Sequence, residues 1–272
     1  MPEGPEIRRA ADRIEKVVRG HRATEVFFAF ERLRPYAAEL HGRTITRIET
    51  RGKAMLSWFD DELAVYSHNQ LYGRWFVRKR GLPKTGRQLR FAMHTENGSA
   101  LLYSASDISV HAREDLAEHP FLSKLGPDPL VKSTTARRIR SRLRSATFRR
   151  RRLAGLLLDQ SFLSGLGNYL RSEILFDARL HPNWRPLDLD EDEVGRLARS
   201  INRITRRAYR TGGITNDAAR VRTLKAAGRT RREYRHYVFA RAQLPCRVCG
   251  ERVEKEELGG RRIYFCPNCQ PG

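Results

Sequence analysis

The cysteines constrain this chain more than any other residue type, because all four lie within the last 27 residues. They form two Cys-x-x-Cys pairs, Cys246 with Cys249 and Cys266 with Cys269, separated by a sixteen-residue spacer. In a chain without an export signal, this pattern is typical of a metal site rather than of disulfides. Four thiolates complete a tetrahedral zinc shell and leave no place for water, so we expect one structural zinc ion. The site would pin a β-hairpin with its tip near residues 259–262.

The charge balance indicates a nucleic-acid partner. The chain has 53 Lys and Arg residues against 31 Asp and Glu, a net charge of +22 over 272 residues. Such an excess is typical of nucleic-acid binding and, less often, of binding to a membrane surface. No apolar run approaches the roughly 20 residues that span a bilayer. The N-terminus also lacks the apolar segment of a signal peptide. We expect a cytoplasmic, nucleoid-associated bacterial protein that has no membrane partner and, lacking heptads, is a monomer.

The first half of the chain predicts a helix followed by a β-sandwich. Ile7, Ala11, Ile14 and Val18 form one apolar stripe along a helix over residues 5–19. Short strand-like runs separated by turn residues then suggest a sandwich, with the opening helix holding residue 2 at its edge. The predicted strands cover residues 23–30, 43–50, 53–59, 62–67, 75–78, 88–94 and 100–104.

The second half is predicted to be helical. After a proline-containing linker, Thr134 could cap an arginine-rich helix to about residue 145, whose arginines suit either solvent or phosphate. An apolar helix from residue 153, a glycine turn at 164–168 and a helix from Asn168 follow. A further helix over 190–210 ends at a glycine pair. Residues 214–233 are polar and basic with little periodicity, and we expect a mobile loop there.

The first six residues, Met-Pro-Glu-Gly-Pro-Glu, offer a nucleophile. If Met1 is removed, Pro2 carries a free secondary amine. An α-amino group has a pKa of about 7.7–8.0, so a useful fraction is the free base at neutral pH. Such an amine can form a Schiff base at a sugar C1′, with Glu3 beside it to move protons. The alternative is an ordinary N-terminus, in which Pro2 and Pro5 start a helix and Glu3 and Glu6 complement its dipole.

Taken together, four motifs resemble the formamidopyrimidine-DNA glycosylase and endonuclease VIII family of bacterial DNA glycosylases. They are the Pro-Glu-Gly-Pro-Glu start, Arg-Gly-Lys at 51–53, the Leu-Asp-Gln…Gly-Leu-Gly-Asn signature at 158–168, and the terminal cysteines. The resemblance covers the whole chain. The stretch Tyr-Ser-His-Asn-Gln-Leu-Tyr-Gly at 66–73 is most similar to the endonuclease VIII branch.

The resemblance implies base excision followed by strand cleavage. Pro2 would attack C1′ of a damaged nucleotide and expel the base, and Glu3 would protonate the sugar or shuttle protons. Lys53, on a strand after a glycine, would donate a proton and contact phosphate. Glu6 would shape the pocket, and β,δ-elimination would then open the strand.

The resemblance also implies the DNA contacts. A flipped base leaves a hole in the stack, and Gln70, Leu71 and Tyr72 match the residues that fill it. Without the resemblance, Leu71 and Tyr72 would be read as ordinary strand-end packing. Asn168 would hold phosphates beside the lesion. Arg261 would be the finger's catalytic phosphate contact, with the adjacent Arg262 as the alternative DNA-binding residue.

We therefore expect an α+β multidomain protein with a flanked β-sandwich over 1–125, a helix–two-turn–helix domain over 126–235 and a zinc-ribbon finger over 236–272. Its function would be that of a bifunctional glycosylase and lyase acting on oxidised pyrimidines in double-stranded DNA. The first alternative is the same chemistry on oxidised purines, such as 8-oxoguanine and formamidopyrimidines. The second is a zinc-ribbon DNA-binding protein without catalysis.

Overall fold

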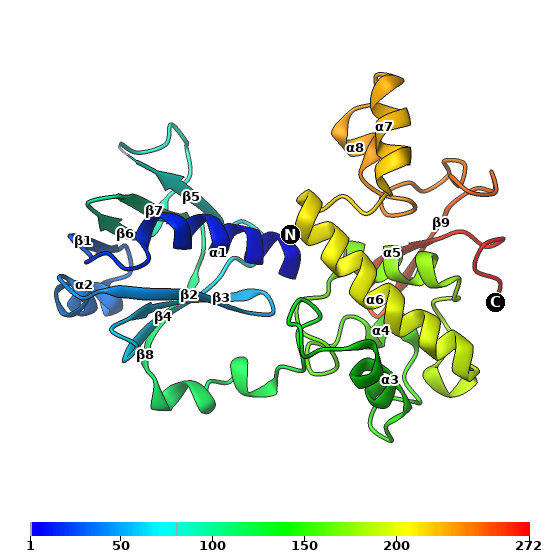
Figure 1. Ribbon diagram of the computed structural model, residues 1–272, viewed down its shortest axis with the longest axis horizontal. Coiled ribbons are helices and arrows are strands. Elements are labelled where there is room, and N and C mark those ends of the chain that lie inside the picture. The colour runs from blue at the N-terminus through cyan, green and yellow to red at the C-terminus, as the bar shows by residue number, and fades with distance from the viewer. Residues whose placement is uncertain (1, 80) are drawn as a thin grey trace. The chain divides into compact units, whose positions relative to one another are not determined.

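The computed structural model describes residues 2–79 and 81–272, which form two compact units that divide between Lys124 and Leu125 (Figure 1). Unit 1 is built from β-sheets and unit 2 mainly from helices. The mixed α+β class predicted from the sequence is therefore confirmed, including the sandwich, the helical part and the cysteine-bearing hairpin. Among the described residues, no helix combines the length and apolar character needed to cross a membrane.

Unit 1 contains two antiparallel four-stranded sheets, with strand orders β1-β6-β7-β5 and β2-β3-β4-β8. The strands are β1 (Glu25–Phe28), β2 (Ile45–Arg51), β3 (Ala54–Phe59), β4 (Leu63–His68), β5 (Arg74–Arg78), β6 (Leu89–Thr95), β7 (Gly98–Tyr103) and β8 (Asp107–Ala112). The helical segments are α1 (Gly4–Val18), η1 (Glu31–Leu33), α2 (Arg34–Leu40), η2 (Glu114–Ala117) and η3 (Leu122–Lys124). The seven predicted strands are all present, with ends that differ by at most two residues.

Helix α1 packs against strands of both sheets (Figure 1). The stripe predicted from the sequence is the buried face: Ile7, Ala11, Ile14 and Val18 are each 0–2% exposed. They join one apolar cluster with residues of both sheets. The burial of this face anchors the helix, and it therefore anchors the residues just before its first turn.

Two elements of unit 1 were not predicted. Strand β8 follows Ser104, which adopts a left-handed φ of +56°, and it interleaves polar residues with Ile108 and Val110. Helix α2 has only seven residues, with a proline in its first turn. Short segments of this kind carry too few residues for a period to be recognised, so contacts with neighbouring elements decide their conformation.

Unit 2 is organised around α6 (Glu191–Thr211), which lies beside α5 (Asn168–Ala178) and α3 (Ala136–Arg144) (Figure 1). The remaining elements are α4 (Leu153–Leu156), η4 (Pro186–Asp188), α7 (Ala218–Ala226), α8 (Arg231–Tyr234) and the hairpin β9 (Glu254–Leu258) to β10 (Arg261–Phe265). Helix α6 starts at the cap Asp190 and ends at Gly212, as predicted. The cap of α3 is Thr135 rather than Thr134, because the Thr135 side chain accepts the Arg138 amide.

The prediction of an irregular loop over residues 214–233 was wrong. This segment contains α7 and α8, neither of which has a buried residue. The Asp217 carboxylate caps α7 by accepting the Arg220 amide at 2.8 Å, and Thr230 with Glu233 forms a capping box at α8. Because no face of either helix is buried, the sequence shows no apolar period, and capping holds these helices instead.

Replacing Ile14 by alanine should lower the free energy of unfolding of unit 1 by about 2–5 kcal/mol, because it empties a fully buried site. Denaturant unfolding followed by circular dichroism would measure this. Arg19→Ala, which removes an exposed ion pair to Glu15 next to the same helix, should cost less than about 1 kcal/mol. Equal losses in the two variants would contradict the anchoring role of the stripe.

Candidate catalytic and nucleic-acid-binding site

Pro2 stands at the start of α1, beside a cavity of about 270 Å³. The cavity is also lined by Glu6 from α1 and by Leu71, Tyr72 and Arg87 from the connections next to β5. Glu3 is the N-cap of α1 and is only 3% exposed, and its backbone amide donates to a Glu6 carboxylate oxygen at 3.1 Å. The predicted nucleophile and its two neighbouring carboxylates therefore lie together at the immobile end of a packed helix.

Lys53 lies in the hairpin turn between β2 and β3, not on a strand as expected. The turn is formed by Gly52 and Lys53, with Gly52 at a left-handed φ of +61°, so the preceding glycine permits the tight reversal. The pKa of the His68 imidazole is lowered, mainly by burial. The Asp107 carboxylate acts to raise this pKa, and the Lys53 ammonium acts to lower it further. The charge of Lys53 therefore acts on His68, at the end of β4 where the predicted void-filling residues begin.

The predicted void-filling residues protrude from unit 1. Leu71 is 58% and Tyr72 71% exposed, although both are large apolar side chains. Gln70 precedes them with a left-handed φ of +49°, which is uncommon for a residue with a side chain. Strand-end packing, the alternative explanation for Leu71 and Tyr72, is thus contradicted by their exposure. Exposed side chains of this size mark a surface that contacts a partner.

In unit 2, Asn168 is the first residue of α5, where the sequence placed a helix start. Its side-chain amide donates to the Arg262 carbonyl at 2.7 Å, and its carbonyl oxygen accepts from Arg171 at 2.7 Å. Asn168 therefore ties the glycine turn to the β9–β10 hairpin. Arg261 and Arg262 are the first two residues of β10. Both are exposed, as a phosphate contact requires.

Arg171, which the sequence analysis did not single out, supports the positions of Asn168 and the hairpin. Its side chain is fully buried, which is rare for a guanidinium, and it donates to the backbone carbonyls of Ala154, Arg261 and Arg262. It also holds Asn168, so one arginine joins α4, α5 and the hairpin. The signal in the sequence was weak, because α5 also carries the charged residues Glu173 and Asp177.

Glu173, two positions later on α5, is buried on a different side of the helix. Its carboxylate accepts the backbone amides of Tyr237, Val238 and Phe239 at 2.8–2.9 Å and the Thr215 hydroxyl at 2.5 Å. Burial raises the pKa of Glu173, while these four donors lower it. The contacts fix the chain just before the cysteine-bearing segment.

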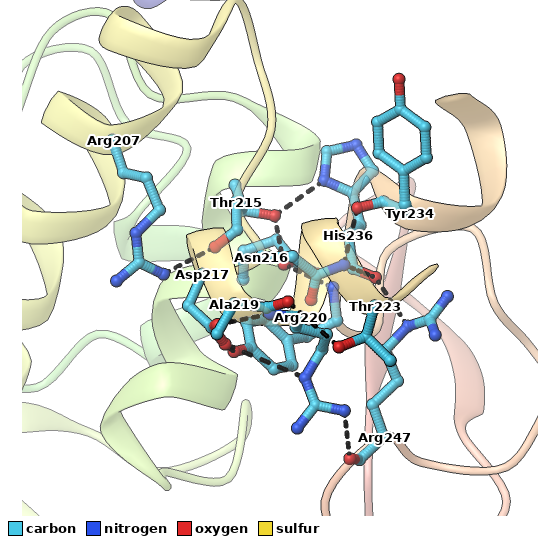
Figure 2. Close-up of polar contacts among 12 residues, drawn as sticks. Arg207, Thr215, Asn216, Asp217, Ala219, Arg220, Thr223, Tyr234, His236 and Arg247 are labelled. Carbon is cyan, nitrogen blue, oxygen red and sulfur yellow. Dashed lines mark hydrogen bonds and ion pairs between the residues drawn. The ribbon is translucent and has the colours of Figure 1, made fainter. Parts of the chain in front are cut away.

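The segment that follows α6 is held to this point by polar contacts (Figure 2). Figure 2 shows the Thr215 hydroxyl beside the His236 ring, with Oγ1 and Nδ1 2.9 Å apart. The Asn216 amide donates to the carbonyls of Tyr234 and His236, and the Arg220 guanidinium donates to the Arg247 carbonyl. The base of the α7–α8 segment is therefore anchored, although its helices are exposed.

The four cysteines fit a metal ion. Their sulfur atoms all lie within 4.8 Å of one another, with Cys246 and Cys269 at 3.9 Å and Cys249 and Cys266 at 3.4 Å. A tetrahedron of zinc–sulfur bonds of about 2.3 Å places its sulfurs about 3.8 Å apart. Two Cys-x-x-Cys turns thus converge from either side of the β9–β10 hairpin, as the spacing predicted.

Family models match most of this chain. The N-terminal domain of formamidopyrimidine-DNA glycosylase matches residues 1–106, and its H2TH domain matches residues 125–219. A zinc finger described as found in this glycosylase and in IleRS matches residues 243–272.

The similar proteins span the full chain. It is 46% identical to Endonuclease 8 of Escherichia coli and 45% identical to that of Klebsiella pneumoniae, each over 99% of this chain and 100% of the relative. Among solved structures, the Fpg protein of Lactococcus lactis in complex with DNA that contains an oxidised pyrimidine covers 100% of both chains, with a TM-score of 0.81 and 25% identity. The same protein bound to DNA that contains N7-benzyl-Fapy-dG aligns equally well.

The stability of unit 2 should fall in acid because of His236. Burial, with Arg235 and Arg231 adding to it, lowers the pKa of this imidazole to about 2. The unfolded chain takes up a proton near the ordinary pKa of about 6.5, so stability present above that pH is lost as the pH falls below it. At pH 5 the loss is about 2 kcal/mol.

Unfolding free energies measured at pH 7 and pH 5 would test this expectation. His236→Gln should lose less stability between the two pH values than the unmodified chain, because it has no imidazole to titrate. The exposed His41, replaced by Gln, should leave the difference unchanged. An unaltered pH dependence in His236→Gln would contradict the assignment.

Proposed function

This chain belongs to the formamidopyrimidine-DNA glycosylase and endonuclease VIII family, and we propose that Pro2 is the nucleophile with which it excises oxidised pyrimidines. The chain is a DNA glycosylase with apurinic/apyrimidinic lyase activity in base excision repair. Its substrate is damaged double-stranded DNA, and we propose that it acts as a monomer on the bacterial chromosome in the cytoplasm.

The chemistry begins after loss of Met1. The free-base nitrogen of Pro2 attacks C1′ of the damaged nucleotide, the bond from C1′ to the base breaks, and the base leaves with a proton. Glu3 supplies a proton to the sugar ring or relays it, because it is the carboxylic acid that directly follows Pro2 in the chain. The ring opens and the C1′–nitrogen link becomes an iminium.

The iminium makes the neighbouring C2′ hydrogen acidic. Loss of that proton expels the 3′ phosphate, and a second elimination expels the 5′ phosphate. Water then releases the sugar fragment from Pro2, so a one-nucleotide gap with phosphate ends remains. Lys53 and Glu6 assist, Lys53 by contacting phosphate and donating a proton and Glu6 by shaping the pocket.

The observation that carries this proposal is the cavity that Pro2 shares with Leu71 and Tyr72. A nucleophile that reaches a sugar needs its nucleotide out of the stack, and something must then fill the hole. Two exposed apolar side chains beside Pro2, with Gln70, suit that task. In unit 2, the backbone at Asn168 and the guanidinium groups of Arg261 or Arg262 would hold the phosphates, since guanidinium and helix starts both favour anions.

The pyrimidine preference rests on the relatives named Endonuclease 8 and on the matching residues 70–72. The purine alternative keeps the same chemistry and is favoured by one observation. The solved Fpg protein that shares the fold was also bound to DNA containing a formamidopyrimidine of guanine.

Covalent trapping tests both the nucleophile and the substrate. Borohydride reduces the iminium and locks the protein onto the DNA. We expect a trapped band with a thymine glycol duplex that disappears in Pro2→Thr and falls at least about a hundredfold in Glu3→Gln, the size of a general acid contribution. Both variants should still bind DNA, because neither removes a phosphate contact.

Each of the other outcomes would reject a specific part of the proposal. Trapping mainly on 8-oxoguanine would keep the mechanism and reject the pyrimidine preference. Tight binding without any trapped band would leave a DNA-binding protein without catalysis. A mass measurement that finds Met1 retained in cells would reject Pro2 as the nucleophile, because its nitrogen would then be an amide.

We further propose that the four cysteines hold one zinc ion with a structural role. Elemental analysis should find about one zinc per chain, and Cys266→Ala should lose it. The variant should bind DNA about 10- to 100-fold more weakly, because an unpinned hairpin no longer presents Arg261 and Arg262 to phosphate. Arg252→Ala, in the same segment but outside the metal shell, should keep the ion. Iron in place of zinc would contradict the assignment.

A further inference from the structure

The backbone of Tyr72 is held by a contact from outside its own segment, although the side chains of Leu71 and Tyr72 are both exposed. The Arg87 guanidinium donates from Nη1 to the Tyr72 carbonyl at 2.8 Å. Arg87 belongs to the connection between β5 and β6, whereas Tyr72 belongs to the connection between β4 and β5. This hydrogen bond therefore clamps two separate connections together, at the cavity that both residues share with Pro2.

The other contacts of the segment also fix its backbone. The Ser106 hydroxyl donates to Gln70 Oε1 at 2.6 Å. The backbone amide of Gln70 donates to His68 Nδ1 at 3.1 Å. The Gly73 amide donates to the Asn69 carbonyl at 2.7 Å. A Cβ placed on Gly73 would lie 2.5 Å from that carbonyl oxygen, so the turn is too tight for any other residue.

The backbone conformation of residues 70–73 is unfavourable in itself, and the hydrogen bonds of the segment must offset its free-energy cost. Gln70 occupies a left-handed conformation, which residues with side chains seldom adopt without support. Neither Leu71 nor Tyr72 is packed into the core, so apolar burial does not stabilise the turn. Of the polar contacts, the Arg87 bond is the one that reaches the backbone of Tyr72 itself.

We propose that Arg87 is a positioning residue that keeps Leu71 and Tyr72 in the shape they need to enter the DNA stack. The inference rests on the proposed function, because it concerns how the void-filling residues act. A segment already ordered before binding does not lose conformational freedom at the moment of insertion, so insertion is favoured. The bond is made to a backbone carbonyl, and the effect therefore does not depend on which base lies opposite.

The experiment compares substrates that need void filling with one that does not. Single-turnover rates of Arg87→Ala would be measured on a lesion-containing duplex and on a single-stranded oligonucleotide with an abasic site. We expect a fall of about tenfold on the duplex, the order of one charge-assisted hydrogen bond, and little change on the single strand. A 2-aminopurine opposite the lesion would report the slower insertion by its fluorescence.

Lys84→Ala provides the matched control, because Lys84 is an exposed cation in the same connection and the change removes the same charge. It should behave as the unmodified protein on both substrates. Equal losses of the single-turnover rate in Lys84→Ala and Arg87→Ala would mean that Arg87 acts only by general electrostatic attraction for DNA. That result would overturn the inference. A loss of Arg87→Ala activity on both substrates would also overturn it, since it would reflect damage to the catalytic centre.

Unchanged activity of Arg87→Ala on the duplex would overturn the inference alone and leave the proposed function intact. Absence of cleavage by the unmodified protein on either substrate would overturn the proposed function, and with it the role of Arg87. The two failures are therefore distinguishable in the same assay.

Discussion

The burial of helix α1 is the constraint on which the candidate site depends, because a nucleophile near a chain end, as proposed for Pro2, works only if that end is held in place. Chain termini are ordinarily the most mobile part of a domain. Pro2 directly precedes the cap of a helix whose stripe from Ile7 to Val18 is buried against both sheets. The sandwich therefore anchors the helix, and the helix places Pro2, the proposed nucleophile, beside the cavity.

The helical unit solves a related problem with buried charge. Arg171 and Glu173 lie two positions apart on α5, about 200° around the helix, so they point to different sides. Arg171 holds Asn168 and the start of β10, and Glu173 holds the backbone at residues 237–239. Each charge is satisfied by several partners, and loss of one partner would leave a buried polar group unpaired. The cysteine-bearing hairpin and the chain that leads to it are thus held to the helices by these contacts.

Local patterns predicted the regular parts of the fold. Helix α1 showed an apolar period that matches its buried face, and Asp190 and the glycine pair marked the ends of α6. Prediction failed where no face is buried, as in α7, or where the element is short, as in α2 and β8. In those places the conformation depends on caps and on strand neighbours, which a sequence period does not record.

The sequence by itself identified the four cysteines, Pro2 and residues 70–72 as candidates, because each is a matter of residue type and spacing. Only the tertiary structure showed that Leu71 and Tyr72 are exposed and that Lys53 lies in a turn. It also showed that the Asn168 side chain is hydrogen-bonded to the hairpin. It also revealed Arg87, Arg171 and Glu173. Apart from Asn168, which Arg171 contacts within α5, the partners of these side chains lie at least fifteen positions away, and pairing over such distances is set by folding rather than by local pattern.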